Sequence, residues 1–151
     1  NDNNCKLIHV STDYVYDGLQ VEAYDELNET APLNVYGKTK LDGENAILSV
    51  MGFGAIILRT SWLYSEYENN FVDTILNLSH KSNNLNIVSD QIGTPTYASD
   101  LACALLEIIK NEKFCQSNQT SEIFHYSNEN IIIGFFDIFI NDFLTIFTHI
   151  R

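Results

Sequence analysis

Two short apolar runs flank a longer helical segment, and each run ends in polar residues. The first run, Lys6–Val10, precedes Ser11-Thr12-Asp13, and the second, Ala55–Arg59, precedes Thr60-Ser61-Trp62. Runs of this kind are typical of buried strands. Between them the pattern predicts a helix from about Pro32 to Met51, because proline is favoured in the first turn of a helix. This order predicts a crossover unit with two parallel strands.

The rest of the chain continues the alternation of helices and strands. We expect a helix from about Asn70 to His80, a strand at Leu85–Val88, a helix capped by Ser99 with an apolar stripe of Leu101, Leu105 and Ile108, and a short strand at Ile123–Tyr126. This order favours the α/β class, with a parallel sheet covered by helices. Ligands bind at the carboxyl ends of such strands, so both polar strand ends should border one cleft.

The composition argues against several classes of partner. Eight Lys and Arg residues against twenty Asp and Glu residues give a formal net charge of −12, which disfavours binding to nucleic acid or to a membrane surface. The cysteines and histidines lack the spacing of a metal site. The first residues carry no secretion signal, so we expect a cytoplasmic protein. The stretch 131–150 is rich in Phe and Ile, but Asp137 and Asp142 interrupt it, which favours a buried or partner-facing element over a membrane span.

Tyr36 and Lys40 lie four residues apart on the predicted helix, so their side chains share a face. That face continues through Gly43 to Val50, which predicts that it is turned toward the protein. Gly37 and Gly43 each cost a helix about 1 kcal/mol relative to alanine, so we expect a close neighbour at both. The pair alone is also compatible with an ordinary packed tyrosine and an extended lysine.

Together with Thr12, this pair fits acid catalysis on a carbonyl group. A free phenol has a pKa of about 10, and an adjacent ammonium favours the phenolate, which makes proton transfer at neutral pH easier. Thr12 adds a hydroxyl at a strand end that can hydrogen-bond the same carbonyl oxygen. We therefore interpret Tyr36 as the acid, Lys40 as the group that tunes it and Thr12 as the group that holds the carbonyl.

Six sequence blocks, in order, resemble those of a known family. The blocks are Ser11–Gly18, Pro32–Glu44, Arg59–Tyr64, Asn70–Val72, Asp90–Thr96 and His125–Asn128. They resemble the extended short-chain dehydrogenase/reductase family, most closely its dTDP-4-dehydrorhamnose reductases. The resemblance covers nearly all of the chain as far as Asn128.

This resemblance implies a reaction and a role for each site residue. Tyr36 would protonate the 4-keto oxygen of dTDP-4-dehydro-L-rhamnose while NADPH or NADH delivers hydride, which yields dTDP-L-rhamnose. Lys40, with Tyr36, would contact the cofactor, and Thr12 would assist the proton transfer. Thr12, Asp13 and Trp62 would bind the dTDP-sugar. The resemblance also implies, less specifically, that four further residues shape the substrate side of the site: Gln91, Gly93, Pro95 and Thr96. A homodimer is a further expectation.

The chain departs from the family pattern in two places. None of its seven glycines forms the glycine-rich loop that holds a pyrophosphate at a helix N-terminus. We therefore expect residues 1–128 to be the C-terminal half of a Rossmann-like nucleotide-binding and catalytic domain, interleaved with substrate-binding segments. Residues 129–151 form a divergent apolar tail. On this view the chain is a fragment that would be inactive alone.

Other functions remain open at this point. A related dehydratase would carry a carboxylate where Tyr14 follows Thr12-Asp13, so dehydration is disfavoured and epimerisation less firmly so. A non-catalytic subunit is the other alternative, because the family includes a regulatory partner of methionine adenosyltransferase. His9 and His125, within and beside predicted strands, are expected to be structural.

Overall fold

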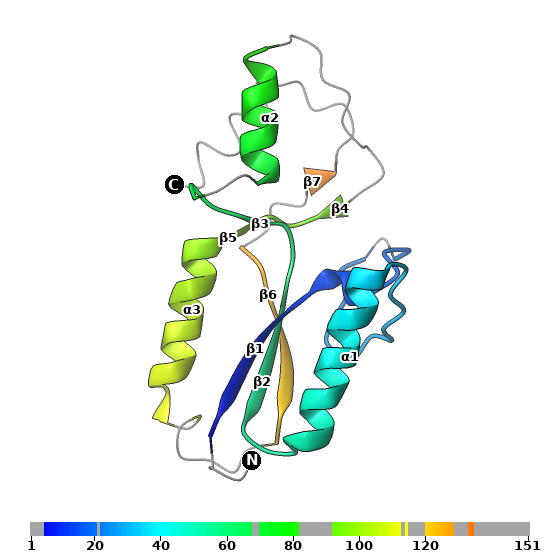
Figure 1. Ribbon diagram of the computed structural model, residues 1–151, viewed down its shortest axis with the longest axis vertical. Helices are drawn as coiled ribbons and strands as arrows, with labels where there is room; N and C mark the ends of the chain where they lie inside the picture. Colours follow the sequence, from blue (N-terminus) through cyan, green and yellow to red (C-terminus); the bar gives the residue numbers. More distant parts are fainter. Residues whose placement is uncertain are drawn as a thin grey trace.

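The computed structural model describes residues 5–20, 22–67, 70–81, 92–112, 114, 120–128 and 133–134. Its central layer is a three-stranded parallel sheet in the order β1-β2-β6 (Figure 1). The three strands span Leu7–Thr12, Ala55–Thr60 and Glu122–Tyr126. The helix α1, Val35–Val50, connects β1 to β2. The α/β class and the predicted crossover unit are therefore confirmed.

The central strand β2 is the most buried part of the sheet. Ile57 and Leu58 are adjacent in β2 and both are buried, although successive side chains of a strand point to opposite faces. Both faces must therefore be covered. Figure 1 shows α1 on one side of the sheet and α3, Ala98–Lys110, on the other. A strand covered on both faces has to be apolar throughout, as the sequence of β2 nearly is.

Asparagine side chains set the starts of α1 and α2. The Asn34 carboxamide oxygen accepts a hydrogen bond from the Gly37 N–H at 2.7 Å, so α1 begins three residues after Pro32. Asn70 caps α2, Phe71–Ser79, in the same way, which agrees with the predicted helix.

The predicted cap of α3 was wrong. The helix begins at Ala98, and its N-cap residue, Tyr97, makes no capping hydrogen bond through its side chain. Ser99 therefore lies inside the first turn, because pairing of Tyr97 in a short strand sets where the helix begins. The apolar stripe is confirmed, since Leu101 is buried while Leu106 is 53% exposed.

A second group of elements lies beyond the carboxyl ends of the sheet (Figure 1). It contains α2 and two small sheets, in which β3 pairs with β5 and β4 with β7. These four strands span Leu63–Tyr64, Thr96–Tyr97, Ile92–Gly93 and Ile133–Gly134. The predicted strand Leu85–Val88 lies outside the described residues, as does the apolar tail except for β7. In the described part of the chain, no helix combines the length and apolar character needed to cross a membrane.

Candidate active site at the carboxyl ends of the strands

The carboxyl ends of β1 and β2 lie side by side, and each ends in a threonine. Thr12 and Thr60 are register partners in the parallel pair. Their exposed fractions are only 6% and 7%. Register partners on adjacent strands project from the same face of a sheet. The two polar strand ends therefore lie next to each other at one edge of the sheet.

Thr12 and Asp13 form a local hydrogen-bonded turn. Thr12 caps the 3₁₀ helix Asp13–Val15: its hydroxyl accepts from the Tyr14 N–H at 3.3 Å and donates to the Asp13 carboxylate at 3.0 Å. Burial raises the pKa of Asp13, against the opposing effect of the hydrogen bond from Thr12 and of backbone hydrogen bonds. A ligand oxygen that accepts from Thr12 must therefore compete with Asp13 for its proton.

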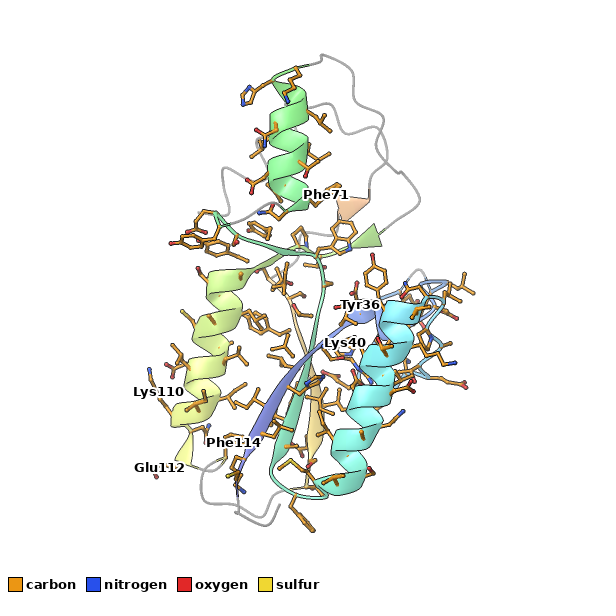
Figure 2. The ribbon with its side chains drawn as sticks, in the orientation of Figure 1. Tyr36, Lys40, Phe71, Lys110, Glu112 and Phe114 are labelled. Atoms are coloured by element: carbon orange, nitrogen blue, oxygen red, sulfur yellow. The ribbon has the colours of Figure 1, made fainter. Side chains whose placement is uncertain are left out.

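Tyr36 lies in the first turn of α1, at the end of the helix that is next to the carboxyl end of β1 (Figure 2). Its ring meets the Tyr14 ring edge-on, with the centroids 5.9 Å apart. The side chain is 55% exposed, so its phenol is accessible. The backbones approach closely at Gly37, where an added Cβ would lie 2.1 Å from the Tyr14 carbonyl oxygen. The predicted close neighbour of Gly37 is thus confirmed.

Lys40 joins the helix to the strand that carries Thr12. Its Nζ donates a hydrogen bond of 2.7 Å to the carbonyl oxygen of Val10, two residues before Thr12. Figure 2 shows Tyr36 and Lys40 on successive turns of α1, on the side that borders β1. The structure therefore places all three predicted catalytic residues at the same end of the sheet.

The face of α1 that packs against the sheet matches the predicted one only in part, because Lys40 and Ile47 are half-buried while Tyr36 and Val50 are exposed. Its buried residues are Gly37 and Glu44, which are two helical turns apart. Tyr36 and Val50 are 55% and 64% exposed, and an added Cβ at Gly43 would meet nothing within 4 Å. The packed face also carries a charged residue, Glu44, which the predicted stripe did not include.

Trp62 lies just after β2, between the sheet and the second group of elements. Its backbone φ is +44°, in the left-handed region that non-glycine residues rarely adopt. The ring packs on Gly93, where an added Cβ would lie 2.7 Å from Cε2. Its centroid is 6.5 Å from that of Phe71, the first residue of α2 (Figure 2). The fold thus holds Trp62 at the edge where the predicted catalytic residues lie.

The segment after β4 contributes buried structure next to this tryptophan. Pro95 and Thr96 are buried, and the Thr94 carbonyl oxygen accepts a hydrogen bond from Ser61 at 2.7 Å. Gln91, the other residue assigned to the substrate side here, lies outside the described residues.

Sequence reasoning missed a buried ion pair between α1 and β2. The distance from Arg59 Nη2 to Glu44 Oε2 is 2.6 Å, and the two side chains are 4% and 1% exposed. Burial alone would lower the pKa of Arg59, but the hydrogen bonds and charge of Glu44 outweigh it and raise the pKa. An arginine at the end of an otherwise apolar strand was the available signal.

The two histidines expected to be structural lie within the fold. His125 in β6 contacts the Tyr16 hydroxyl through Nε2 at 3.0 Å and the Tyr24 carbonyl oxygen through Nδ1 at 3.2 Å. Burial, followed by the charge of Lys40, lowers the pKa of His9. Among the residues described, no three or more His, Cys, Asp or Glu side chains are grouped to hold a metal ion.

Comparison with known proteins assigns the chain to a family. The family model of the RmlD substrate binding domain matches residues 1–138. The dTDP-4-dehydrorhamnose reductase of Aggregatibacter actinomycetemcomitans is 44% identical over 128 residues, which cover 84% of this chain and 42% of that protein. The reductase of Sinorhizobium fredii is 44% identical over 121 residues, covering 80% of this chain and 40% of that protein. The chain thus spans about 40% of the length of these relatives.

Solved structures agree with the sequence comparison. The dTDP-4-dehydrorhamnose reductase of Bacillus anthracis, in complex with NADP, is 35% identical with a TM-score of 0.78, over 95% of this chain and 48% of that one. The Clostridium acetobutylicum reductase is 36% identical with a TM-score of 0.79, over 95% and 47% of the two chains. The match to the family model over most of the chain, on a parallel sheet with the expected site at its edge, shows that the chain belongs to the RmlD substrate-binding-domain family.

Proposed function

We propose that this chain supplies the catalytic residues of an NAD(P)H-dependent oxidoreductase that reduces the 4-keto group of dTDP-4-dehydro-L-rhamnose to dTDP-L-rhamnose. The observation that carries the proposal is the convergence of Tyr36, Lys40 and Thr12 at the carboxyl end of β1. Relatives 44% identical to the chain are named for this reductase.

The proton of the reaction comes from Tyr36. Reduction of a ketone adds a hydride to carbon and a proton to oxygen, so an acid must face the carbonyl oxygen. The phenol of Tyr36 is exposed enough to meet a substrate and to regain its proton from solvent. Thr12 donates its hydroxyl proton to the same oxygen. To do so it gives up its hydrogen bond to the Asp13 carboxylate, so substrate binding changes the surroundings of that carboxylate.

The donor set of this edge suits the ribose and nicotinamide end of a dinucleotide. Lys40 Nζ has three N–H donors, of which the bond to Val10 uses one, so two remain for ribose hydroxyls. Bound NADPH or NADH supplies the hydride. Lys40 and Tyr36 would hold that end of the cofactor, and Thr12, Asp13 and Trp62 would hold the sugar nucleotide.

The chain's share of its relatives suggests how it relates to the complete enzyme. We assign residues 1–128 to the C-terminal half of the nucleotide-binding and catalytic domain, and residues 129–151 to an apolar tail. The matched share of the relatives, about 40%, supports a partial domain, while the family model continues to residue 138, into the segment assigned to the tail. A cytoplasmic setting and a homodimer remain predictions that accompany it.

Tyr14 favours reduction over the alternatives within the family. Dehydration needs a group that removes a proton from carbon, and a carboxylate after Asp13 would be placed for that task, whereas epimerisation is less firmly disfavoured. Here the position holds Tyr14, whose ring packs against Tyr36. A non-catalytic subunit would keep the fold and bind ligands without turnover.

The test is NADPH and NADH oxidation by the complete gene product with dTDP-4-dehydro-L-rhamnose. Tyr36→Phe should lower kcat by about 10²- to 10⁴-fold, the usual contribution of a general acid. Tyr14→Phe is the matched control, because it removes a neighbouring phenol that has no assigned role, and it should keep most of the activity. Absence of turnover in a folded, cofactor-bound wild type would leave the epimerase or the non-catalytic subunit.

A further inference from the structure

A row of polar side chains crosses the sheet on the face covered by α1. Ser11, Arg59 and His125 are successive register partners on β1, β2 and β6. Ser11 and Arg59 are 3% and 4% exposed. Such a row is unusual for the inner face of a sheet, where buried charge is costly unless it is paired. The groups that pair with these polar side chains therefore indicate the role of the row.

Glu44 of α1 ties two of these strands to the helix. Arg59 Nη2 and Nε donate to the Glu44 carboxylate at 2.6 Å and 3.1 Å. The Ser11 hydroxyl donates to the same carboxylate. One carboxylate thus fixes α1 against β1 and β2 together, through a two-pronged guanidinium contact with a defined orientation.

A third nitrogen of the Arg59 guanidinium contacts the segment that follows Thr12. Arg59 Nη1 donates to the Tyr16 hydroxyl at 2.6 Å, and the guanidinium carbon lies 5.2 Å from the centre of the Tyr16 ring. The same hydroxyl contacts His125 at 3.0 Å. The ion pair therefore contacts both segments that carry the candidate catalytic groups.

The sequence spacing makes this link short. Glu44 follows Lys40 by one helical turn and Tyr36 by two, which is roughly 12 Å along the helix axis at 1.5 Å per residue. Ser11 is bonded directly to Thr12 in the chain. A shift of the ion pair would therefore move Tyr36 and Lys40 relative to Thr12.

Stability alone is a weak reason for such a pair. A buried ion pair often contributes no more to folding than apolar residues of similar size, although loss of one partner is strongly destabilising. Apolar contacts in the same place would not fix the position of α1 relative to the strands as closely as the directional bonds of this ion pair do. We propose that Glu44 and Arg59 are positioning residues, which hold the Tyr36 and Lys40 turns of α1 in register with Thr12 for proton transfer; this rests on the function proposed above.

The experiment separates position from stability with the double variant Glu44→Leu/Arg59→Met in the complete gene product. It removes both charges and leaves no uncompensated one, although the buried Ser11 hydroxyl loses its acceptor, so the midpoint of urea unfolding should fall only modestly. We expect kcat to fall roughly tenfold to a hundredfold, as misplacement of about 1 Å does, while the KM for the sugar nucleotide is unchanged. The exposed pair Lys110–Glu107 offers a matched control. Glu107→Gln should leave the unfolding midpoint, kcat and KM unchanged.

Ser11→Ala provides a milder test if the double variant does not fold. It removes one hydrogen bond to Glu44 and keeps the ion pair, and it should lower kcat in the same direction with KM unchanged. Arg59→Lys keeps the charge without the two-pronged contact, so its kcat should lie between those of the wild type and the double variant. Wild-type kcat in either the folded double variant or Ser11→Ala would overturn the proposal.

A readout without turnover keeps this proposal separate from the reductase assignment. Hydrogen–deuterium exchange of a peptide covering residues 35–40 should speed up in the double variant and in Ser11→Ala, but not in Glu107→Gln. If the wild type has no reductase activity and exchange changes as expected, the assigned function fails and the positioning role stands. Unchanged exchange in both variants would overturn the positioning role whatever the activity.

Discussion

The two glycines of α1 allow a sharp test of its packing. Gly37→Ala and Gly43→Ala make the same chemical change in the same helix, and alanine stabilises a helix by about 0.5–1 kcal/mol relative to glycine. Their surroundings differ. An added Cβ at Gly37 would lie 2.1 Å from the Tyr14 carbonyl oxygen, whereas at Gly43 nothing lies within 4 Å.

The expected magnitudes follow from these distances. Ordinary contact begins at 3.4 Å, so Gly37→Ala requires a backbone displacement of roughly 1 Å or more. Overpacking costs about 1–3 kcal/mol, and a backbone neighbour places this case at the upper end. Gly43→Ala should therefore raise the free energy of unfolding by about 0.5–1 kcal/mol, and Gly37→Ala should lower it by about 2 kcal/mol.

Urea denaturation of both variants measures the difference directly. The gain in helix propensity is largely common to the two, so their difference of about 3 kcal/mol reports the contact between Gly37 and Tyr14. Thermal unfolding should separate them by about 6–12 °C, at 2–4 °C per kcal/mol for a domain of 150–250 residues. Equal stabilisation by both substitutions would refute the close approach of α1 to the turn after β1.

Three further variants test other parts of the site. Asn34→Ala removes the cap of α1 and should lower the free energy of unfolding by about 1 kcal/mol in urea denaturation. His9 has a pKa below its ordinary 6.5, through burial first and the charge of Lys40 second; its stabilising contribution is therefore present above pH 6.5 and is lost as pH falls through the folded-state pKa. Stability measured against pH should fall less steeply below 6.5 in His9→Gln, and identical slopes would contradict this. Gly93→Ala should displace the Trp62 ring, cost about 1–3 kcal/mol and change the tryptophan fluorescence relative to wild type.

Local patterns predicted the elements that form the sheet edge. The apolar runs before Ser11 and Thr60 became β1 and β2, and the polar residues at their ends became neighbours. Asn70 also marked the start of α2 correctly. These features depend on burial periodicity and on capping within one turn, and both can be read from adjacent residues.

The helix that carries the candidate site was predicted less well. Tyr36 and Lys40 do share a helix, but the buried residues of α1 are Gly37 and Glu44. A glutamate can occupy a buried face only when a partner neutralises it, and its partner, Arg59, lies on another element, 15 residues away in the chain. Ser99 failed as a cap for a similar reason. Tyr97, just before α3, pairs with Tyr64 of the remote strand β3, and this pairing sets where the helix begins.

The sequence by itself determined the α/β alternation, the two polar strand ends and the shared face of Tyr36 and Lys40, because each depends on spacing within one element. Only the tertiary structure decided which face of α1 is buried and that Glu44 pairs with Arg59 and Ser11. It also decided that the backbone of Trp62 has a positive φ and that its ring packs on Gly93. Those features require the register of separate strands and the approach of distant backbones. The physical reason is that contacts between elements depend on how they pack together, which the pattern within any one of them does not contain.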